Sequence, residues 1–129
     1  MRSYLLITQV PSAVFFFYLG VIRVITPYDA LAIDHEWVRR CAPQVVTLIG
    51  MIELMSALGL LVYPLTHRYA EVTIISAFGL AILMLGAATV QLRLGDLLLA
   101  LYDVVLMVHF LALTRVHVRE VRMNEEELD

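Results

Sequence analysis

The sequence predicts an all-α integral membrane protein, an antiparallel four-helix bundle with a short interfacial helix in its first loop. Of its 129 residues, 61% are hydrophobic and 16% are charged, whereas soluble domains have about 45–50% and about 25%. A soluble monomer of this size could not bury so much apolar surface. A single cysteine excludes an intrachain disulfide and a multi-cysteine metal site. The net charge of −3, with arginine as the only basic residue besides histidine, excludes a basic stripe for nucleic acid.

Four apolar runs are each long enough to cross the hydrocarbon core of a membrane. A helix needs about 20 mostly apolar residues to span about 30 Å of hydrocarbon. Lipid offers no partners for free backbone groups, so each run must be helical. The expected spans cover residues 4–25, 44–63, 69–92 and 97–114. They define one transmembrane domain over residues 1–115, followed by a charged tail at 116–129 that we expect to be a solvated helix end.

Prolines mark where these helices begin, bend and end. Pro27 and Pro64 lie just beyond the first and second expected spans, where a proline cannot continue the helix. Pro43 suits the opening of the second helix. Pro11 lies inside the first span, so we expect a bend there and a freed carbonyl at Ile7.

The connections between the spans differ in length. Two are tight turns, near residues 64–68 and 93–96, so their flanking helices must be antiparallel neighbours. The first connection, residues 26–42, is longer and mixes charged side chains with Leu31, Ile33 and Trp37. Such a mixture is typical of a short amphipathic helix that lies in the membrane interface.

An even number of spans places both chain ends on one side of the membrane. That side carries five arginines, and the opposite side carries three, or four when Arg23 at a span edge is included. Because arginine is enriched in cytoplasmic loops, the excess favours a cytoplasmic location for both ends. We therefore expect a protein of the cytoplasmic (inner) membrane.

Polar and small residues gather on one stripe of each expected span, at helical spacings of three and four. The lipid-facing and bundle-facing sides therefore separate, with a polar bundle interior that lets helices approach closely. The stripes comprise Gln9, Ser12, Phe16, Gly20 and Arg23 in the first span; Gly50, Glu53, Ser56 and Ala57 in the second; Thr73, Ser76, Ala77, Met84, Ala87, Ala88 and Gln91 in the third; and Tyr102, Asp103, Leu106, His109 and Phe110 in the fourth.

Four of these polar groups are expected to meet on the first-loop side of the bundle. Arg23 and Gln91 end their spans on that side. At 1.5 Å per residue, Glu53 and Asp103 lie roughly 9–14 Å below the same surface. A charge at mid-membrane costs about 2.5–3.5 kcal/mol on insertion scales, so these residues call for an explanation.

The chemistry of these groups suits proton transfer to a bound molecule. Two carboxylates in a medium of low dielectric constant repel each other, so we expect one to hold a proton while Arg23 keeps the other ionised. Glu53, Asp103 and Arg23 are therefore the candidate catalytic residues. The candidate ligand-binding residues are Gln91, Tyr102, His109, Phe16, Met84 and Ser56, of which Tyr102 and His109 are placed to orient a carbonyl or quinone oxygen.

A purely structural interpretation competes with this one. In it, Arg23 and Glu53 form an ion pair that specifies helix packing, and Asp103 hydrogen-bonds Gln91 or Tyr102 to lock two helices together. Two acids for one arginine favour a functional cavity, because packing alone needs no second carboxylate. The histidines show no metal-ligand spacing, so no metal site is expected.

A motif in the second expected span carries a family resemblance. In the segment Leu48–Pro64, a glycine at Gly50 is followed three residues on by Glu53, then by Gly-Leu-Leu and a closing proline. This segment resembles the second span of the DoxX-like membrane proteins. The pair Gly20 and Arg23 resembles the glycine and basic residue of that family's first span.

The resemblance extends over about the first 95 residues. Arg68 and the segment Leu83–Ala87 are similar to the family's third span, although its members commonly carry a histidine near the end of that span, where this chain has Gln91. The resemblance implies a four-helix membrane bundle. The family is named after a subunit of a thiosulfate:quinone oxidoreductase, and other relatives look like partners in membrane redox complexes or assembly factors. The architecture is also distantly similar to bundles that bind sterols or isoprenoids, although a fold does not fix a function.

Two functions of different classes are consistent with these patterns. The first is a buried polar cavity for a quinone or isoprenoid-like ligand, serving acid–base chemistry or a subunit of a membrane redox complex. The second is a non-catalytic membrane partner or assembly factor; a transporter would need broken helices or repeats. No cofactor motif or redox-active side-chain pair is visible, so a quinone is the one cofactor considered. The expected partners are membrane lipid, a hydrophobic small molecule and a larger membrane complex or homo-oligomer, and not nucleic acid.

Overall fold

The computed structural model describes residues 2–128, with side chains from Leu6 onward, as a chain of six helices. Four helices are long and apolar enough to cross a membrane, which confirms the predicted four-span helical architecture. They are joined by short connections, of which the first contains the two remaining helices. The helices are α1 (Arg2–Ile25), α2 (Tyr28–Asp34), α3 (Glu36–Arg39), α4 (Pro43–Thr66), α5 (Ala70–Leu94) and α6 (Leu97–Glu126).

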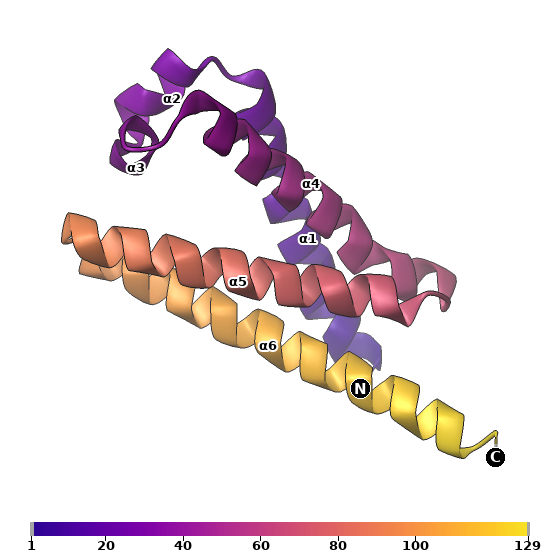
Figure 1. The fold of residues 1–129 in the computed structure, drawn as a ribbon. Helices are drawn as coiled ribbons and strands as arrows, with labels where there is room; N and C mark the ends of the chain where they lie inside the picture. Colours follow the sequence, from indigo (N-terminus) through magenta and orange to yellow (C-terminus); the bar gives the residue numbers. More distant parts are fainter. Residues whose placement is uncertain (1, 129) are drawn as a thin grey trace.

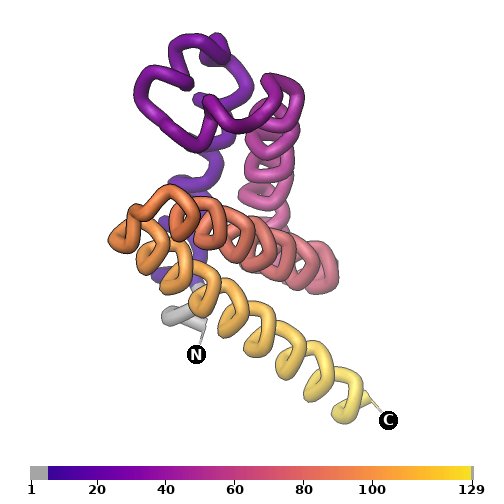
Figure 2. The backbone as a smooth tube through the Cα atoms, turned by 60° about the vertical axis from the view of Figure 1, so that its left-hand side comes forward, coloured from indigo at the N-terminus to yellow at the C-terminus, as the bar shows by residue number. Residues whose placement is uncertain are grey.

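The long helices form two antiparallel pairs that cross each other. α1 packs along α4, α5 packs along α6, and α4 contacts α5 where the pairs meet. Figure 1 shows the α1–α4 pair running steeply across the α5–α6 pair, and Figure 2 shows the same crossing from the side. The end that carries α2 and α3 stands apart from the turn between α5 and α6. α3 nevertheless contacts α5, so the first loop also connects the two pairs.

An apolar cluster at the crossing holds the two pairs together. Phe16 of α1 packs edge-on against Phe110 of α6, with ring centroids 5.3 Å apart, and both side chains are buried. Contacts of this kind replace the hydrophobic driving force that helices lack in lipid. The buried members of the cluster are Ala13, Phe16, Ala57, Leu60, Ala77, Leu80, Ala81, Met84, Phe110 and Leu113.

Glycine allows two close approaches between helices. A Cβ atom on Gly20 would lie 2.8 Å from the carbonyl oxygen of Gly50, so α1 and α4 touch through their backbones. A Cβ atom on Gly59 would lie only 1.9 Å from Oγ of Ser76, which fixes α4 against α5. Small residues at such positions are what close packing of membrane helices requires.

The end of α4 differs from the prediction. The sequence placed Pro64 beyond the second span, but the proline lies inside the helix, which continues to Thr66. A proline removes one helical hydrogen bond and leaves a carbonyl without its donor. Side chains from α1 and α5 compensate for this loss, as described below, and the sequence of α4 alone carries no sign of them.

The first loop also differs in detail, because it holds two short helices instead of one. His35 adopts an extended conformation, with φ −127°, and separates α2 from α3. The hydroxyl of Tyr28 lies 2.9 Å from the carbonyl oxygens of both Val38 and Cys41. Arg39 donates hydrogen bonds to the carbonyls at the end of α2. These contacts fold the loop into a cap above α1 and α4.

α6 continues without a break through the segment that the sequence assigned to a charged tail. Its 30 residues measure about 45 Å at 1.5 Å per residue, well beyond the hydrocarbon thickness of about 30 Å. His117, inside that segment, is only 1% exposed. Figure 1 shows the last turns of α6 extending past the other helices.

Candidate functional site

The ion pair between Arg23 and Glu53 is the centre of the first-loop side. Nη1 of Arg23, in the last turn of α1, contacts Oε1 of Glu53 on α4. Gly20 and Gly50 bring the two backbones together one turn away, so the side chains reach each other easily. Glu53 is 1% exposed, and its second oxygen, Oε2, has no hydrogen-bond partner within residues 2–128. The pair therefore leaves one buried carboxylate oxygen available.

Trp37 is a member of this site that the sequence assigned only to the membrane interface. The guanidinium carbon of Arg23 lies 5.2 Å from the centre of the Trp37 ring, in a cation–π arrangement. The guanidinium of Arg23 thus contacts both the carboxylate of Glu53 and the indole of Trp37. The break at His35 turns α3 back over α1, and no local pattern in the loop sequence predicts that turn.

The second acid of the predicted site, Asp103, lies on α6. It is partly buried, and Arg23 is close enough to act on its carboxyl group electrostatically. Within the part of the chain that the structure describes, Asp103 makes no hydrogen bond. Arg23 pairs with Glu53, whereas no ion pair joins it to Asp103 among the described residues.

A cleft opens beside this group, where the two helix pairs diverge. Its volume is about 650 Å³. One wall is the loop between α2 and α3, including Trp37, and the other is the turn between α5 and α6, including Gln91. The side-chain amide of Gln91 has no hydrogen-bond partner among residues 2–128. Trp37 lines the cleft and contacts Arg23, and Gln91 lines it from the opposite pair. Arg23, Glu53 and Asp103 themselves do not line the cleft.

The remaining predicted ligand-binding residues lie elsewhere. Phe16 and Met84 belong to the apolar cluster at the crossing. Ser56 is 9% exposed and faces α5, where a Cβ atom on Gly79 would lie 3.9 Å from its hydroxyl. Nε2 of His109 lies 3.3 Å from the hydroxyl of Ser12, on the terminal side. Tyr102 is 48% exposed on the outer surface of α6. None of these five residues lines the cleft.

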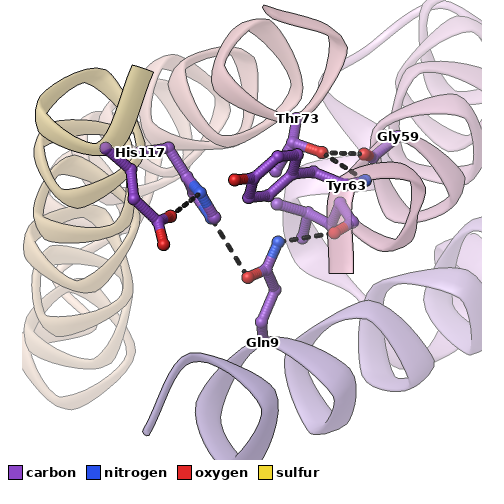
Figure 3. Close-up of polar contacts among 7 residues, drawn as sticks. Gln9, Gly59, Tyr63, Thr73 and His117 are labelled. Carbon is purple, nitrogen blue, oxygen red and sulfur yellow. Dashed lines mark hydrogen bonds and ion pairs between the residues drawn. The ribbon is translucent and has the colours of Figure 1, made fainter. Parts of the chain in front are cut away.

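A second polar cluster occupies the terminal side of the bundle (Figure 3). The amide nitrogen of Gln9 donates to the carbonyl of Leu60, which is the carbonyl that Pro64 leaves without a helical donor. The amide oxygen of Gln9 lies 3.2 Å from Nε2 of His117, and both side chains are buried. Gln9 therefore links α1, α4 and α6.

Thr73 of α5 also hydrogen-bonds backbone groups of α4 near Pro64. Its hydroxyl donates to the carbonyl of Gly59 at 2.8 Å and accepts from the backbone N–H of Tyr63 at 3.1 Å, as Figure 3 shows. The hydroxyl thus stands between two groups that would bond directly in a regular helix. A buried threonine and glutamine from neighbouring helices satisfy α4 where its own hydrogen bonding fails.

The sequence analysis missed His117 because it treated the segment after Thr114 as solvated. A signal was present, since Phe110, Leu113 and His117 follow one another at spacings of three and four and share a buried face of α6. Nδ1 of His117 lies 3.8 Å from Oε2 of Glu120, too far for a hydrogen bond. Both residues line a small cavity of about 40 Å³, and neither atom has a hydrogen-bond partner among the described residues.

Neither polar region contains the donor set of a metal centre. Among residues 2–128, no group of three or more histidine, cysteine, aspartate or glutamate side chains is arranged to hold a metal ion.

Comparison with known proteins identifies the family. The chain matches the model of the DoxX-like family over residues 7–113. The chain belongs to the DoxX-like family. The match includes Asp103 and His109 on α6, beyond the resemblance seen in the sequence, and ends before His117 and Glu120 of this DoxX-like protein. No curated protein and no solved structure matches the chain.

Proposed function

We propose that this DoxX-like membrane protein binds a hydrophobic small molecule of the quinone or isoprenoid kind in the cleft on its first-loop side. The observation that carries the proposal is the buried, unpartnered Oε2 of Glu53 beside Arg23. A buried carboxylate oxygen without a partner is costly, so such groups in a native protein point to a role beyond packing. A cleft volume of about 650 Å³ also falls within the range of small-molecule sites, about 300–1,000 Å³.

The residues around the cleft divide the binding work between them. Trp37 offers an aromatic wall to an apolar body. The free amide of Gln91 can donate a hydrogen bond to a carbonyl or quinone oxygen from the opposite wall. Arg23 spends one of its five N–H groups on Glu53 and keeps the others for a ligand oxygen. The head of the ligand therefore lies between the two helix pairs.

The two acids next to Arg23 supply acid–base chemistry in this proposal. One carboxyl group holds a proton that it donates to a ligand oxygen, and the other, as carboxylate, accepts one. Glu53 and Asp103 are the two groups, and the positive charge of Arg23 favours the ionised form of the carboxyl group that it contacts. The protein acts either on the ligand directly or as the ligand-binding subunit of a membrane redox complex.

The position of Trp37 offers a direct test, since it is the only tryptophan in the chain. Quinones quench indole fluorescence on contact, so we titrate the protein in nanodiscs with decylubiquinone. We expect saturable quenching in the wild type and at least about tenfold weaker binding in Glu53→Gln and Asp103→Asn, each of which removes one of the two acids of the proposed site. Glu120→Gln, which changes an acid in the other polar cluster, is the matched control and should bind like the wild type. Quenching that rises linearly in every folded variant contradicts the proposal.

A second candidate function is that of a non-catalytic partner or assembly subunit. The observation in its favour is the exposed, charged end of α6, which extends past the other helices and offers a surface for a larger complex or a second copy of the chain. Gentle solubilisation followed by size-exclusion chromatography and mass spectrometry distinguishes the two functions. A stable larger complex that disappears when residues 119–129 are removed supports the second candidate, whereas a monodisperse protein carrying an extracted hydrophobic ligand supports the first.

We also propose that the protein lies in the cytoplasmic membrane with both ends in the cytoplasm. The excess of arginine on the terminal side supports this orientation. The cap formed by α2 and α3 then faces outward. In a Cys41→Ser background, the exposed Glu36→Cys should react with a membrane-impermeant maleimide added to intact cells, whereas Arg119→Cys should react only after lysis. The reverse pattern contradicts the orientation.

A further inference from the structure

We infer that the cleft selects a ligand whose polar head carries no negative charge, an inference that rests on the proposed function and narrows its ligand class. A quinone or an isoprenoid alcohol fits this description, whereas a phosphorylated isoprenoid does not. Three features of the cleft lead to the inference. Its walls carry acidic side chains, arginines of α1 and the first loop already have partners, and a carboxylate lies at the helix N-terminus that borders it.

The charged residues on the walls of the cleft are acidic. Asp34 and Glu36 lie on the wall formed by α2 and α3, and Asp96 lies on the opposite wall, in the turn before α6. His35 is the only basic side chain among the residues that line the cleft within residues 2–128. Acids on both sides of one opening repel an anionic head from either wall.

Three arginines of α1 and the first loop, near the cleft, are already engaged, whereas Arg93 at the end of α5 makes no hydrogen bond or ion pair among the described residues. Arg23 is bound to the buried Glu53 and lies over Trp37. Arg40 pairs with Glu36 at 3.4 Å, and Arg39 donates to the carbonyls of Ala32 and Ile33. An anionic head that drew one of these three arginines away from its partner would break an existing contact. For Arg23 this would leave Glu53 buried and unpaired, which is a large cost.

The N-terminus of α6 borders the cleft and would ordinarily attract an anion. Here an anion of the protein itself already lies at that end, because the carboxylate of Asp96 accepts from the backbone N–H of Leu99 at 3.1 Å. The backbone N–H groups of Leu97 and Leu98 therefore lie beside a negative charge. The carboxylate of Asp96 therefore offsets the partial positive charge at the N-terminus of α6, which would otherwise attract a phosphate group.

The experiment compares three probes that share one chain: farnesol, farnesylamine and farnesyl diphosphate. Each competes with decylubiquinone for the wild-type protein in nanodiscs, with quenching of Trp37 as the readout. We expect farnesol and farnesylamine to displace the quinone, and farnesyl diphosphate to do so at least about tenfold less well. Raising the salt concentration should narrow this gap, because the cleft is open to solvent on one side.

The three probes also partition differently into the bilayer, which could change their apparent affinities. Variants that lack the acidic side chains of the cleft walls test whether electrostatic repulsion causes the difference. In the double variant Asp34→Asn/Glu36→Gln, the ratio of diphosphate to farnesol affinity should rise about threefold or more over the wild type. The control Asp29→Asn/Glu126→Gln removes the same charge from exposed positions outside the cleft and should leave the ratio unchanged. All four positions are exposed, so the variants should fold.

The outcomes distinguish this inference from the proposed function. If farnesyl diphosphate competes as well as farnesol, or if the ratio is the same in wild type and double variant, the charge selectivity is wrong while the ligand site stands. If decylubiquinone produces no saturable quenching, the ligand site itself fails, and the inference fails with it.

Discussion

The two ends of this bundle both bury polar side chains, but they use them differently. At the terminal end, Gln9 and Thr73 spend their hydrogen bonds on backbone groups that Pro64 disturbs, around a cavity of about 40 Å³. At the first-loop end, Glu53 has a free buried oxygen, and the neighbouring cleft measures about 650 Å³. A cavity of the smaller size has room for a water molecule that links His117 to Glu120, and not for a ligand. Both ends have buried polar atoms without partners, since Nδ1 of His117 and Oε2 of Glu120 are also unpaired among the described residues. The size of the neighbouring space therefore distinguishes the candidate site.

A dry layer separates the two ends. Phe16 lies between Gln9 and Arg23 on α1, and Phe110 lies between Asp103 and His117 on α6. The two rings pack together, and both are 1% exposed or less. The sequence analysis counted Phe16 and Met84 as ligand contacts because they share a stripe with the polar residues. In the structure they belong to the apolar cluster at the crossing, so packed apolar side chains separate the two polar regions.

Phe110→Ala should have the largest effect, because it opens this layer. We expect a loss of about 3–5 kcal/mol in the free energy of unfolding, from lost contacts and the cavity left behind. Reversible denaturation in mixed micelles measures this loss. The neighbouring Leu111→Ala, at a position 39% exposed, is the control and should change little. Equal losses in both variants would contradict the view that the crossing is the packed core.

Gln9→Leu should have an intermediate effect on stability and none on ligand binding. It leaves the carbonyl of Leu60 and Nε2 of His117 without partners, which costs about 1–3 kcal/mol. The same denaturation assay, together with the quinone titration, tests both halves of the prediction. Gln44→Leu, at an exposed position on α4, serves as the control. A weakened ligand affinity in the folded Gln9 variant would show that the ends are coupled.

Gln91→Leu should show the opposite pattern, with the smallest change in stability. The amide of Gln91 has no partner within the described chain, so its removal should cost less than about 0.5 kcal/mol. Loss of a hydrogen bond to the ligand should weaken quinone affinity about tenfold. Tyr102→Phe, which removes a hydroxyl on the outer surface of α6, should leave the affinity unchanged. An unchanged affinity in the Gln91 variant would remove that residue from the site.

The sequence predicted what depends on hydrophobicity and helical periodicity. Apolar length gave the four spans, and the stripes predicted that Arg23 and Glu53 face the interior, where the structure pairs them. What it did not predict depends on contacts distant in the sequence. Pro64 remains inside α4 because Gln9, from another helix, binds the freed carbonyl. Trp37 reaches Arg23 only because the loop breaks at His35 and folds back.

The contact between Gly20 and Gly50 has a consequence for how the protein can move. With the backbones of α1 and α4 already touching beside Arg23 and Glu53, we expect these two helices to move together. A methyl group at Gly20 would push α1 and α4 apart and move the guanidinium of Arg23 away from the carboxylate of Glu53. An apolar substitution would therefore break the ion pair.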